Sequence, residues 1–216
     1  MSDRKIKLPI QEEITVDVID YVLKQHSKEA NRIDKLKSYY DNHNDILKRV
    51  VKDITKPNNK LSHPYCAFIT DMAVGHFLGV PVAYKSDNEE LINRLTEIND
   101  YNDESDNNST LAIWQSIAGY GIDLIYIDEE AMPRFKAVNP ATVAVVYDDS
   151  IAENIQFAIR YFDIPKIGNN EKQVQIEIYT KNSIVTYVKG NNEYKLVKEE
   201  YHYFNDVPIS VYANND

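Results

Sequence analysis

The sequence predicts an α+β fold, with helices in the first half of the chain and antiparallel strands in the second. Apolar residues recur at helical spacing up to Gly119, and after Gly121 the repeat changes to the alternation typical of strands. Since helices precede strands instead of alternating with them, a Rossmann-like arrangement is not expected. The chain has 216 residues, 43% of them hydrophobic, which is enough to bury a core.

The N-terminal region predicts two amphipathic helices followed by a break. Thr15 can cap the first helix and Ser27 the second. Their apolar faces consist of Val18, Ile19, Val22 and Leu23, and of Ile33, Leu36 and Tyr40. Pro57, followed by two asparagines, interrupts the periodicity. We therefore predict an N-terminal helical segment at 1–57 and an α+β core at 58–216.

The segment from Pro64 to Leu78 predicts a helix at the centre of the core, ended by Gly79. Gly75 inside this helix indicates a close neighbour, because glycine costs about 1 kcal/mol against alanine in a helix. Periodicity selects ten core residues: Tyr65, Phe68, Ile69, Met72, Phe77, Trp114, Ile117, Ile125, Val145 and Ile159.

Two further helices are predicted before the strands begin. Ser86 and Glu89 form a possible capping box ahead of the first. Asp106 or Asn107 can open the second, which Gly119 and Gly121 would close.

Seven short runs rich in β-branched and aromatic residues then predict successive antiparallel strands. They are Ile122 to Ile127, Arg134 to Val138, Thr142 to Tyr147, Ile155 to Tyr161, Val174 to Thr180, Ile184 to Val188, and Tyr194 to Lys198. The hairpin signals are Asp148-Asp149, Gly168-Asn169-Asn170 and Gly190-Asn191-Asn192.

Composition and motifs argue against an enzyme and against tight DNA binding. The net charge of −10 disfavours gripping a polyanion, although it is compatible with DNA sliding past. Catalytic signatures such as G-x-S-x-G, the phosphate loop and H-E-x-x-H do not occur. The single cysteine, Cys66, lies on the apolar helix and is expected to be a small buried hydrophobe. No stretch is long and apolar enough to predict a membrane span.

Three acidic clusters have the residue types of a metal or catalytic site, but each is better explained as solvated charge. Asp100 to Asp106 lacks the glycine and glutamate of a calcium loop, so a solvated loop is expected there. The acids at Asp128 to Glu130 and at Asp148-Asp149 fall at polar turns. The five histidines lack the spacing of a helical metal site. We therefore assign no catalytic, cofactor-binding or metal residue, and expect no cofactor.

Several strings, in order along most of the chain, carry a resemblance to a known family. The strongest is Ile69 to Tyr84, an apolar helix with two glycines that runs into a G-x-P-[VI]-x-Y exit. The other strings are Tyr39 to Arg49, Asn58 to Leu61, Ile117 to Gly121 with the following strand, Asn139 to Asp148, Ala158 to Tyr161, and His202 to Ile209. Together they resemble the portal proteins of tailed double-stranded DNA bacteriophages, in the wing portion. Asn205 stands where the family usually has glycine, and asparagine tolerates a left-handed backbone.

This resemblance implies a structural virion protein. Family portals form rings of about twelve subunits at one capsid vertex, where double-stranded DNA is packaged and later ejected. They contact the terminase large subunit, the scaffolding and major capsid proteins, and the head–tail connector, first in the host cytoplasm and then in the virion. The resemblance also implies that the stem, clip and crown lie outside this chain, which is then expected to be monomeric or weakly associated by itself.

Two alternatives remain open at this level. One is a free-standing phage protein-interaction domain with a portal wing fold. The other is a metal-dependent enzyme acting on nucleic acid, which would need the acids at Asp128 to Glu130 and Asp148-Asp149 to bind a divalent ion.

Overall fold

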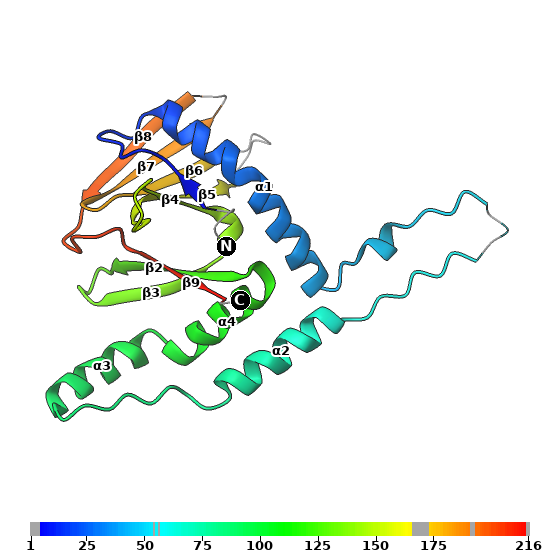
Figure 1. Cartoon of the computed structure of the whole chain (residues 1–216), viewed down its shortest axis with the longest axis horizontal. Helices are drawn as coiled ribbons and strands as arrows, with labels where there is room; N and C mark the ends of the chain where they lie inside the picture. Colours follow the sequence, from blue (N-terminus) through cyan, green and yellow to red (C-terminus); the bar gives the residue numbers. More distant parts are fainter. Residues whose placement is uncertain (1–4, 54, 56, 166–172, 191–192, 215–216) are drawn as a thin grey trace. The chain divides into compact units, whose positions relative to one another are not determined.

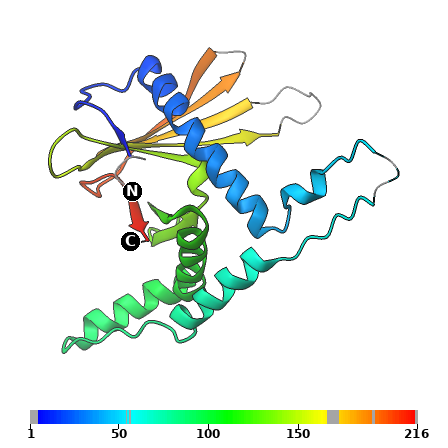
Figure 2. The same ribbon diagram turned by 45° about the vertical axis from the view of Figure 1, so that its right-hand side comes forward.

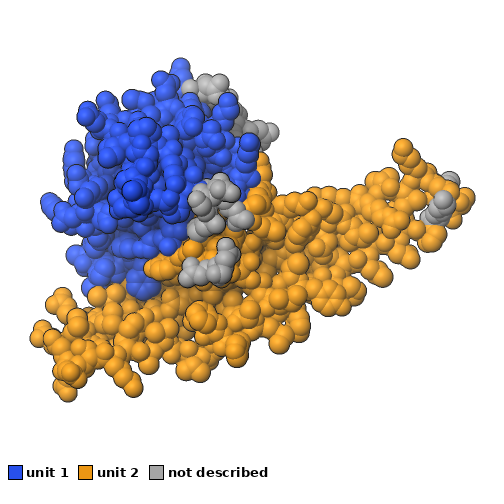
Figure 3. Space-filling view, in the orientation of Figure 1, with its two compact units in different colours: residues 1–30, 122–211 blue, residues 31–121, 212–216 orange. Residues whose placement is uncertain are grey.

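A computed structural model describes residues 5–53, 55, 57–165, 173–190 and 193–214, and it has the predicted α+β order. The chain divides into two compact units (Figure 3). Unit 1 comprises residues 1–30 and 122–211, and unit 2 comprises residues 31–121 and 212–216. The expected boundary at residues 57 and 58 lies inside unit 2, so the compact units divide elsewhere. The division of the chain into independently folding parts at residues 57 and 58 stays a prediction.

Unit 1 is built on a six-stranded sheet with the order β1-β4-β5-β6-β7-β8 (Figure 1). Its strands are β1 (Ile6–Lys7), β4 (Val143–Tyr147), β5 (Ile155–Ile164), β6 (Gln173–Tyr179), β7 (Ser183–Gly190) and β8 (Glu193–Tyr201). Strands β4 to β8 form an antiparallel meander, as the alternating runs predicted. Strand β1 pairs in parallel with β4 and has too few residues to give a periodic signal.

A second sheet has the order β3-β2-β9, with β2 (Tyr120–Ile127), β3 (Pro133–Val138) and β9 (Ile209–Ala213). The sequence predicted β2 and β3 but not β9, which returns from a segment distant along the chain. Of the hairpin signals, Asp148-Asp149 lies between the paired strands β4 and β5. Gly190 pairs with Glu193 across the β7–β8 hairpin. Residues 168–170 and 191–192 lie outside the described residues.

The core of unit 1 forms where the first half of helix α1 (Val16–Tyr40) lies across one face of the larger sheet (Figure 1). Ile19 and Val22 on the helix are buried against sheet residues, which include Phe157, Ile159 and Ile176. This face is the one that the helical spacing after Thr15 predicted. Burying each such aliphatic or aromatic side chain is worth about 1.5–3 kcal/mol.

The prediction of two N-terminal helices was wrong, because α1 is continuous from Val16 to Tyr40. Ser27 does not cap a new helix: its hydroxyl donates to the carbonyl of Lys24 within the same helix, at 2.7 Å. A serine can satisfy its hydroxyl in this way without breaking a helix, so its presence alone does not mark a start.

Unit 2 contains the second half of α1 and three further α-helices: α2 (Tyr65–Leu78), α3 (Glu89–Tyr101) and α4 (Glu104–Ala118). Between α1 and α2 the chain forms an extended hairpin, with the short 3-10 helix η2 (Asp45–Lys48) at its start. The base of this hairpin is joined by Asn44 and Ser62, whose side chains are 2.5 Å apart. Another 3-10 helix, η3 (Pro140–Thr142), belongs to unit 1 and precedes β4.

The helix boundaries in unit 2 follow the prediction with local differences. Asn88, not Ser86, caps α3, because its side chain accepts from the amide of Leu91 at 3.1 Å. The segment Asp100 to Asp106, expected to be a loop, is instead the end of α3 and the start of α4, with a turn at Asn102 and Asp103. Gly119 ends α4 with a φ of 89°, which suits glycine.

The prediction that α2 is a central core helix was wrong. Thr70 is its one buried residue among those described, and all five of its predicted core residues are exposed: Tyr65, Phe68, Ile69, Met72 and Phe77. Cys66 is exposed as well, against the expectation of burial. Of the other predicted core residues, Ile117 and Ile159 are buried, whereas Trp114, Ile125 and Val145 are partly buried.

Gly75 differs from expectation, whereas Gly79 ends the helix as predicted. A Cβ at Gly75 would meet nothing within 4 Å, so no close neighbour explains this glycine. Gly79 follows the helix with a φ of −65°, in the right-handed region. A Cβ at Gly79 would instead overlap the carbonyl oxygen of Gly75, so close backbone approach is the reason for glycine at this position.

Candidate interaction surfaces

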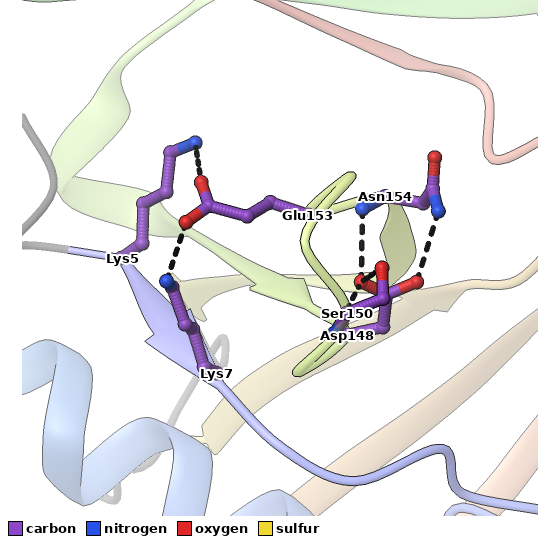
Figure 4. Close-up of polar contacts among 6 residues, drawn as sticks. All are labelled: Lys5, Lys7, Asp148, Ser150, Glu153 and Asn154. Atoms are coloured by element: carbon purple, nitrogen blue, oxygen red, sulfur yellow. Dashed lines mark hydrogen bonds and ion pairs between the residues drawn. The ribbon is translucent and has the colours of Figure 1, made fainter.

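Asp148, directly after β4, stabilises the turn that follows this strand. The Oδ1 atom of Asp148 accepts hydrogen bonds from the amide and hydroxyl of Ser150 and from the amide of Asn154, at 3.2, 2.6 and 3.0 Å (Figure 4). Its Oδ2 atom accepts from the side-chain amide of Asn154 at 3.0 Å. The bonds from Ser150 and Asn154 hold the pKa of Asp148 below its usual range. Its oxygens are therefore occupied by the turn.

Asp128, directly after β2, has a similar structural role. Asp128 accepts through Oδ1 from the amides of Glu130 and Met132, each at 3.0 Å, and so stabilises the turn to β3. Arg134 lies 3.9 Å from its other oxygen. Among the described residues, no group of three or more His, Cys, Asp or Glu side chains could hold a metal ion. At both turns, one aspartate is thus engaged in hydrogen bonds that stabilise the turn.

The N-terminal strand is fastened to unit 1 by a two-lysine clasp. Lys5 donates to Glu153 at 2.5 Å and Lys7 contacts the other carboxylate oxygen of the same residue (Figure 4). These bonds, with that from Lys5 the largest influence, lower the pKa of Glu153 to about 2. The clasp connects residues that are about 150 positions apart in the chain, so periodicity could not reveal it.

His26 is a buried histidine. It is 5% exposed, on α1, and its Nδ1 atom lies 2.9 Å from the hydroxyl of Tyr161 on β5. That hydroxyl donates to the carbonyl of Ala141 at 3.0 Å, so toward the imidazole it acts as an acceptor. Burial is the main reason that the pKa of His26 falls to about 4. A neutral imidazole therefore forms part of the core near neutral pH.

Unit 2 contains a hollow of about 950 Å³, which we call the acidic hollow. It lies between the segment after α2 and the junction of α3 with α4. Its acidic lining residues are Asp100, Asp103, Glu104 and Asp106, and its apolar ones include Pro81, Val82 and Tyr84. Tyr84 donates to Glu104 at 2.8 Å, which fixes one wall. An open acidic surface of this kind suits a basic protein segment better than a polyanion.

Helix α2 exposes five large apolar side chains. We call this set the α2 face and define it as Tyr65, Phe68, Ile69, Met72 and Phe77. The less exposed positions of the helix, Ala67, Thr70, Val74 and Leu78, form a narrow stripe at helical spacing. Thr70 on this stripe shares a hydrogen bond with Ser116 of α4, at 3.0 Å, and Figure 2 shows the two helices side by side. Tyr65, Phe68, Ile69 and Met72 thus point away from the helix that supports α2, whereas Phe77 lies nearer to the stripe.

Comparison with known proteins identifies the family. A family model described as phage portal protein, SPP1 Gp6-like, matches residues 19–216. The chain belongs to this portal family. It is 28% identical to the portal protein of Bacillus phage SPP1 over 75% of this chain and 31% of that protein. It is 25% identical to the portal protein of Clostridium phage phiCD119, over 93% of this chain and 49% of that protein. The chain therefore spans about a third to a half of the curated relatives it matches.

The portal-like strings correspond to defined structural features. In Asn139 to Asp148, Asn139 caps η3 by accepting from the amide of Ala141 at 3.0 Å, and β4 follows. Asn205 has a φ of 57°, so the left-handed backbone that the resemblance implied at this position is confirmed. The Gly79 to Tyr84 exit of the strongest string leads from the α2 face into the acidic hollow. Two candidate interaction surfaces thus adjoin the most characteristic portal segment.

No helix in the described part of this portal-family chain is long and apolar enough to cross a membrane. Neither the α2 face nor the acidic hollow was predicted as a site, because both depend on which side of each helix the fold leaves uncovered. The high apolar content of α2 was the one signal of this surface in the sequence. The helical spacing of its apolar residues led instead to the prediction of a core helix.

Proposed function

We propose that this chain is part of a phage portal protein, a structural component of the vertex ring through which double-stranded DNA is packaged and ejected. The observation that carries the proposal is the family match across residues 19–216, which includes both compact units. The two relatives named above are both portal proteins, from phages of different bacterial hosts. The role is structural and not catalytic.

The partners proposed for the whole protein are further copies of itself, the terminase large subunit, the scaffolding and major capsid proteins, and the head–tail connector. Double-stranded DNA would pass without sequence-specific contact. The net charge of −10 supports passage over capture, since a surface of like charge does not hold a polyanion. Its location would be the portal vertex of the virion, after assembly in the host cytoplasm.

Native mass spectrometry of this chain beside the longer product of its gene, where the gene continues past Asp216, tests this role. We expect the longer product to form a closed ring of about twelve subunits, and the short chain to be monomeric or weakly associated. A longer product that stays monomeric, or a gene that ends at Asp216, would overturn the portal role. The free-standing interaction domain would then replace it. Cleavage of plasmid DNA in the presence of Mg²⁺ would favour the enzyme alternative.

A further inference from the structure

Strand β8 forms one edge of the six-stranded sheet of unit 1, and no other described strand pairs with its outer side (Figure 1). Just after the strand, the amide of His202 donates to the carbonyl of Asn182 at 2.9 Å, so the main chain there points to the β7 side. This direction alternates along an antiparallel strand, and the register of β8 is unbroken from Lys198 to Tyr201. The amides and carbonyls of Glu199 and Tyr201 therefore point away from β7, where an added strand could pair with them.

The two faces of β8 differ in character. The face on the side of α1 carries Tyr194, Leu196, Glu199 and Tyr201, and the opposite face carries Glu193, Lys195, Lys198 and Glu200. Lysines commonly protect an edge strand from pairing, but here they lie on the opposite face, and Lys198 is 2.6 Å from Glu200. On the α1 side, Leu196 is 53% exposed and Tyr201 is 75% exposed. That side of the edge is therefore suited to contact with apolar side chains.

A groove of about 540 Å³, which we call the β8 groove, lies on this face of the sheet. Val185 and Tyr187 of β7 line it together with Leu196 of β8, so the sheet supplies apolar contacts. The segment from Gln11 to Ile14, ahead of α1, lines it as well. Side chains of a strand added at the edge would extend over Leu196 toward this groove, because alternate side chains point to the same face of a sheet.

Hydrogen bonds within unit 1 hold the surroundings of the groove in place. The amide of Gln11 donates to the side-chain oxygen of Gln156 at 3.1 Å, and the side-chain nitrogen of Gln156 donates to the carbonyl of Leu8 at 2.6 Å. On the β8 side, the hydroxyl of Tyr194 donates to Asp20 of α1 at 2.6 Å. Since both sides are already ordered, binding a ligand there costs less conformational entropy.

The charges of the groove indicate the chemistry of its ligand. Its charged lining residues are Glu12, Glu13, Glu199 and Lys181, so acids outnumber bases by three to one. A lysine or arginine placed beside Glu199 on an added strand would form a cross-strand pair of opposite charge. Beside Leu196 and Tyr201, apolar or aromatic side chains are favoured for the same reason.

We infer that the open edge of β8 binds an extended segment of a partner protein. The segment adds to the sheet as a further strand, and at alternate positions it directs apolar and basic side chains toward the β8 groove. Main-chain pairing provides much of the affinity, and the groove selects the side chains. This inference goes beyond the portal role and does not depend on it, because it uses only contacts within unit 1.

Amide hydrogen exchange of the full chain, followed by NMR, tests the strand addition. The probe is a synthetic peptide of about seven residues, in which valine, lysine and tyrosine at alternate positions are separated by threonines. We expect saturable binding that slows exchange severalfold at the outward amides of Glu199 and Tyr201. The amides of Lys198 and Glu200, which point toward β7, should change little. No binding, or binding without slower exchange at the two outward amides, would overturn the inference.

Modified peptides separate main-chain pairing from side-chain contact. Methylation of alternate peptide nitrogens removes the donors that would pair with β8 and keeps every side chain, so it should weaken binding by at least about tenfold. Replacing lysine by glutamate should weaken binding by at least about threefold, because the groove is acidic. Unchanged binding of the methylated peptide would show that no strand is added, and unchanged binding of the glutamate peptide would contradict the assigned ligand chemistry.

Variants of the chain test the position of the ligand. Glu199→Lys should weaken binding of the lysine peptide by at least about threefold. Glu193→Lys makes the same charge change on the opposite face of the same strand and should bind as wild type does. Circular dichroism checks that both variants are folded, and Glu199→Gln replaces Glu199→Lys if the latter unfolds. Equal weakening by both lysine variants would contradict the placement.

Sedimentation velocity with and without the peptide tests whether the chain itself occupies the edge. We expect the peptide to bind without changing the association state of the chain. Self-association that protects the amides of Glu199 and Tyr201 and excludes the peptide would assign the edge to a second copy and overturn the inference.

Discussion

Acidification should destabilise unit 1 through His26. The imidazole is 5% exposed and has a pKa of about 4 in the folded chain, against 6.5 ordinarily. Burial lowers the pKa, and the charge of Glu29 and the carbonyl of Pro140 oppose that effect only in part. Since the unfolded chain binds this proton more readily, the stabilising contribution is complete above pH 6.5 and is lost as the pH falls from 6.5 to 4.

The size of the effect follows from the same shift. One unit of pKa difference corresponds to about 1.4 kcal/mol, so the loss is about 2 kcal/mol at pH 5 and levels off near 3 kcal/mol below about pH 4. For a chain of this length, about 2 kcal/mol corresponds to a melting temperature lower by about 4–8 °C. Glutamates and aspartates also titrate in the lower part of this range. The contribution of His26 must therefore be measured as the difference between the wild-type chain and a variant without this histidine.

Urea unfolding of the wild-type chain and of His26→Gln isolates the contribution of His26. The measurement is made at several pH values between about 5 and 8. The variant is expected to be less stable at about pH 8 but to lose about 2 kcal/mol less on acidification to about pH 5. His43→Gln, at an exposed histidine of unit 2, serves as the control and should leave the wild-type slope unchanged. Equal slopes for the wild-type chain and His26→Gln would refute the reasoning, and so would an NMR titration of His26 near its ordinary pKa.

Further predictions concern substitutions at four positions. Gly79→Ala should destabilise the chain by about 1–3 kcal/mol in thermal unfolding, because its Cβ would overlap the Gly75 carbonyl. Gly75→Ala, in open space on the same helix, should stabilise it by about 1 kcal/mol, and equal effects of the two changes would contradict the contact. Glu153→Gln should speed hydrogen exchange at the β1 end of unit 1 severalfold, because both lysines of the clasp lose their charged partner. Wild type should show the same loosening as the pH falls from about 4.5 toward 2, whereas Glu199→Gln on exposed β8 should exchange as wild type does. Asn205→Gly should be neutral or raise the melting temperature slightly, since a φ of 57° is less strained for glycine; a clear loss would mean that the Asn205 side chain matters more than its backbone.

Local pattern in the sequence determined much of this protein by itself. The alternation after Gly121 predicted strands β2 to β8, because a sheet with one buried face imposes a period of two on each strand. The face of α1 that carries Ile19 and Val22 was predicted for the same kind of reason. The portal resemblance and the left-handed backbone at Asn205 also came from the sequence, since they depend on short strings and on the conformational range of single residues.

Only the tertiary structure decided which apolar surface is core and which is exposed. Helix α2 is apolar on nearly every side, so its sequence contains no information on which side faces α4. A narrow stripe of small and medium side chains makes that contact and leaves Phe68, Met72 and Phe77 exposed. Strand β1, strand β9 and the clasp at Glu153 depend on residues distant in the chain, and local periodicity cannot report such pairings. The candidate interaction surfaces belong to this second class, because exposure is a property of the folded chain.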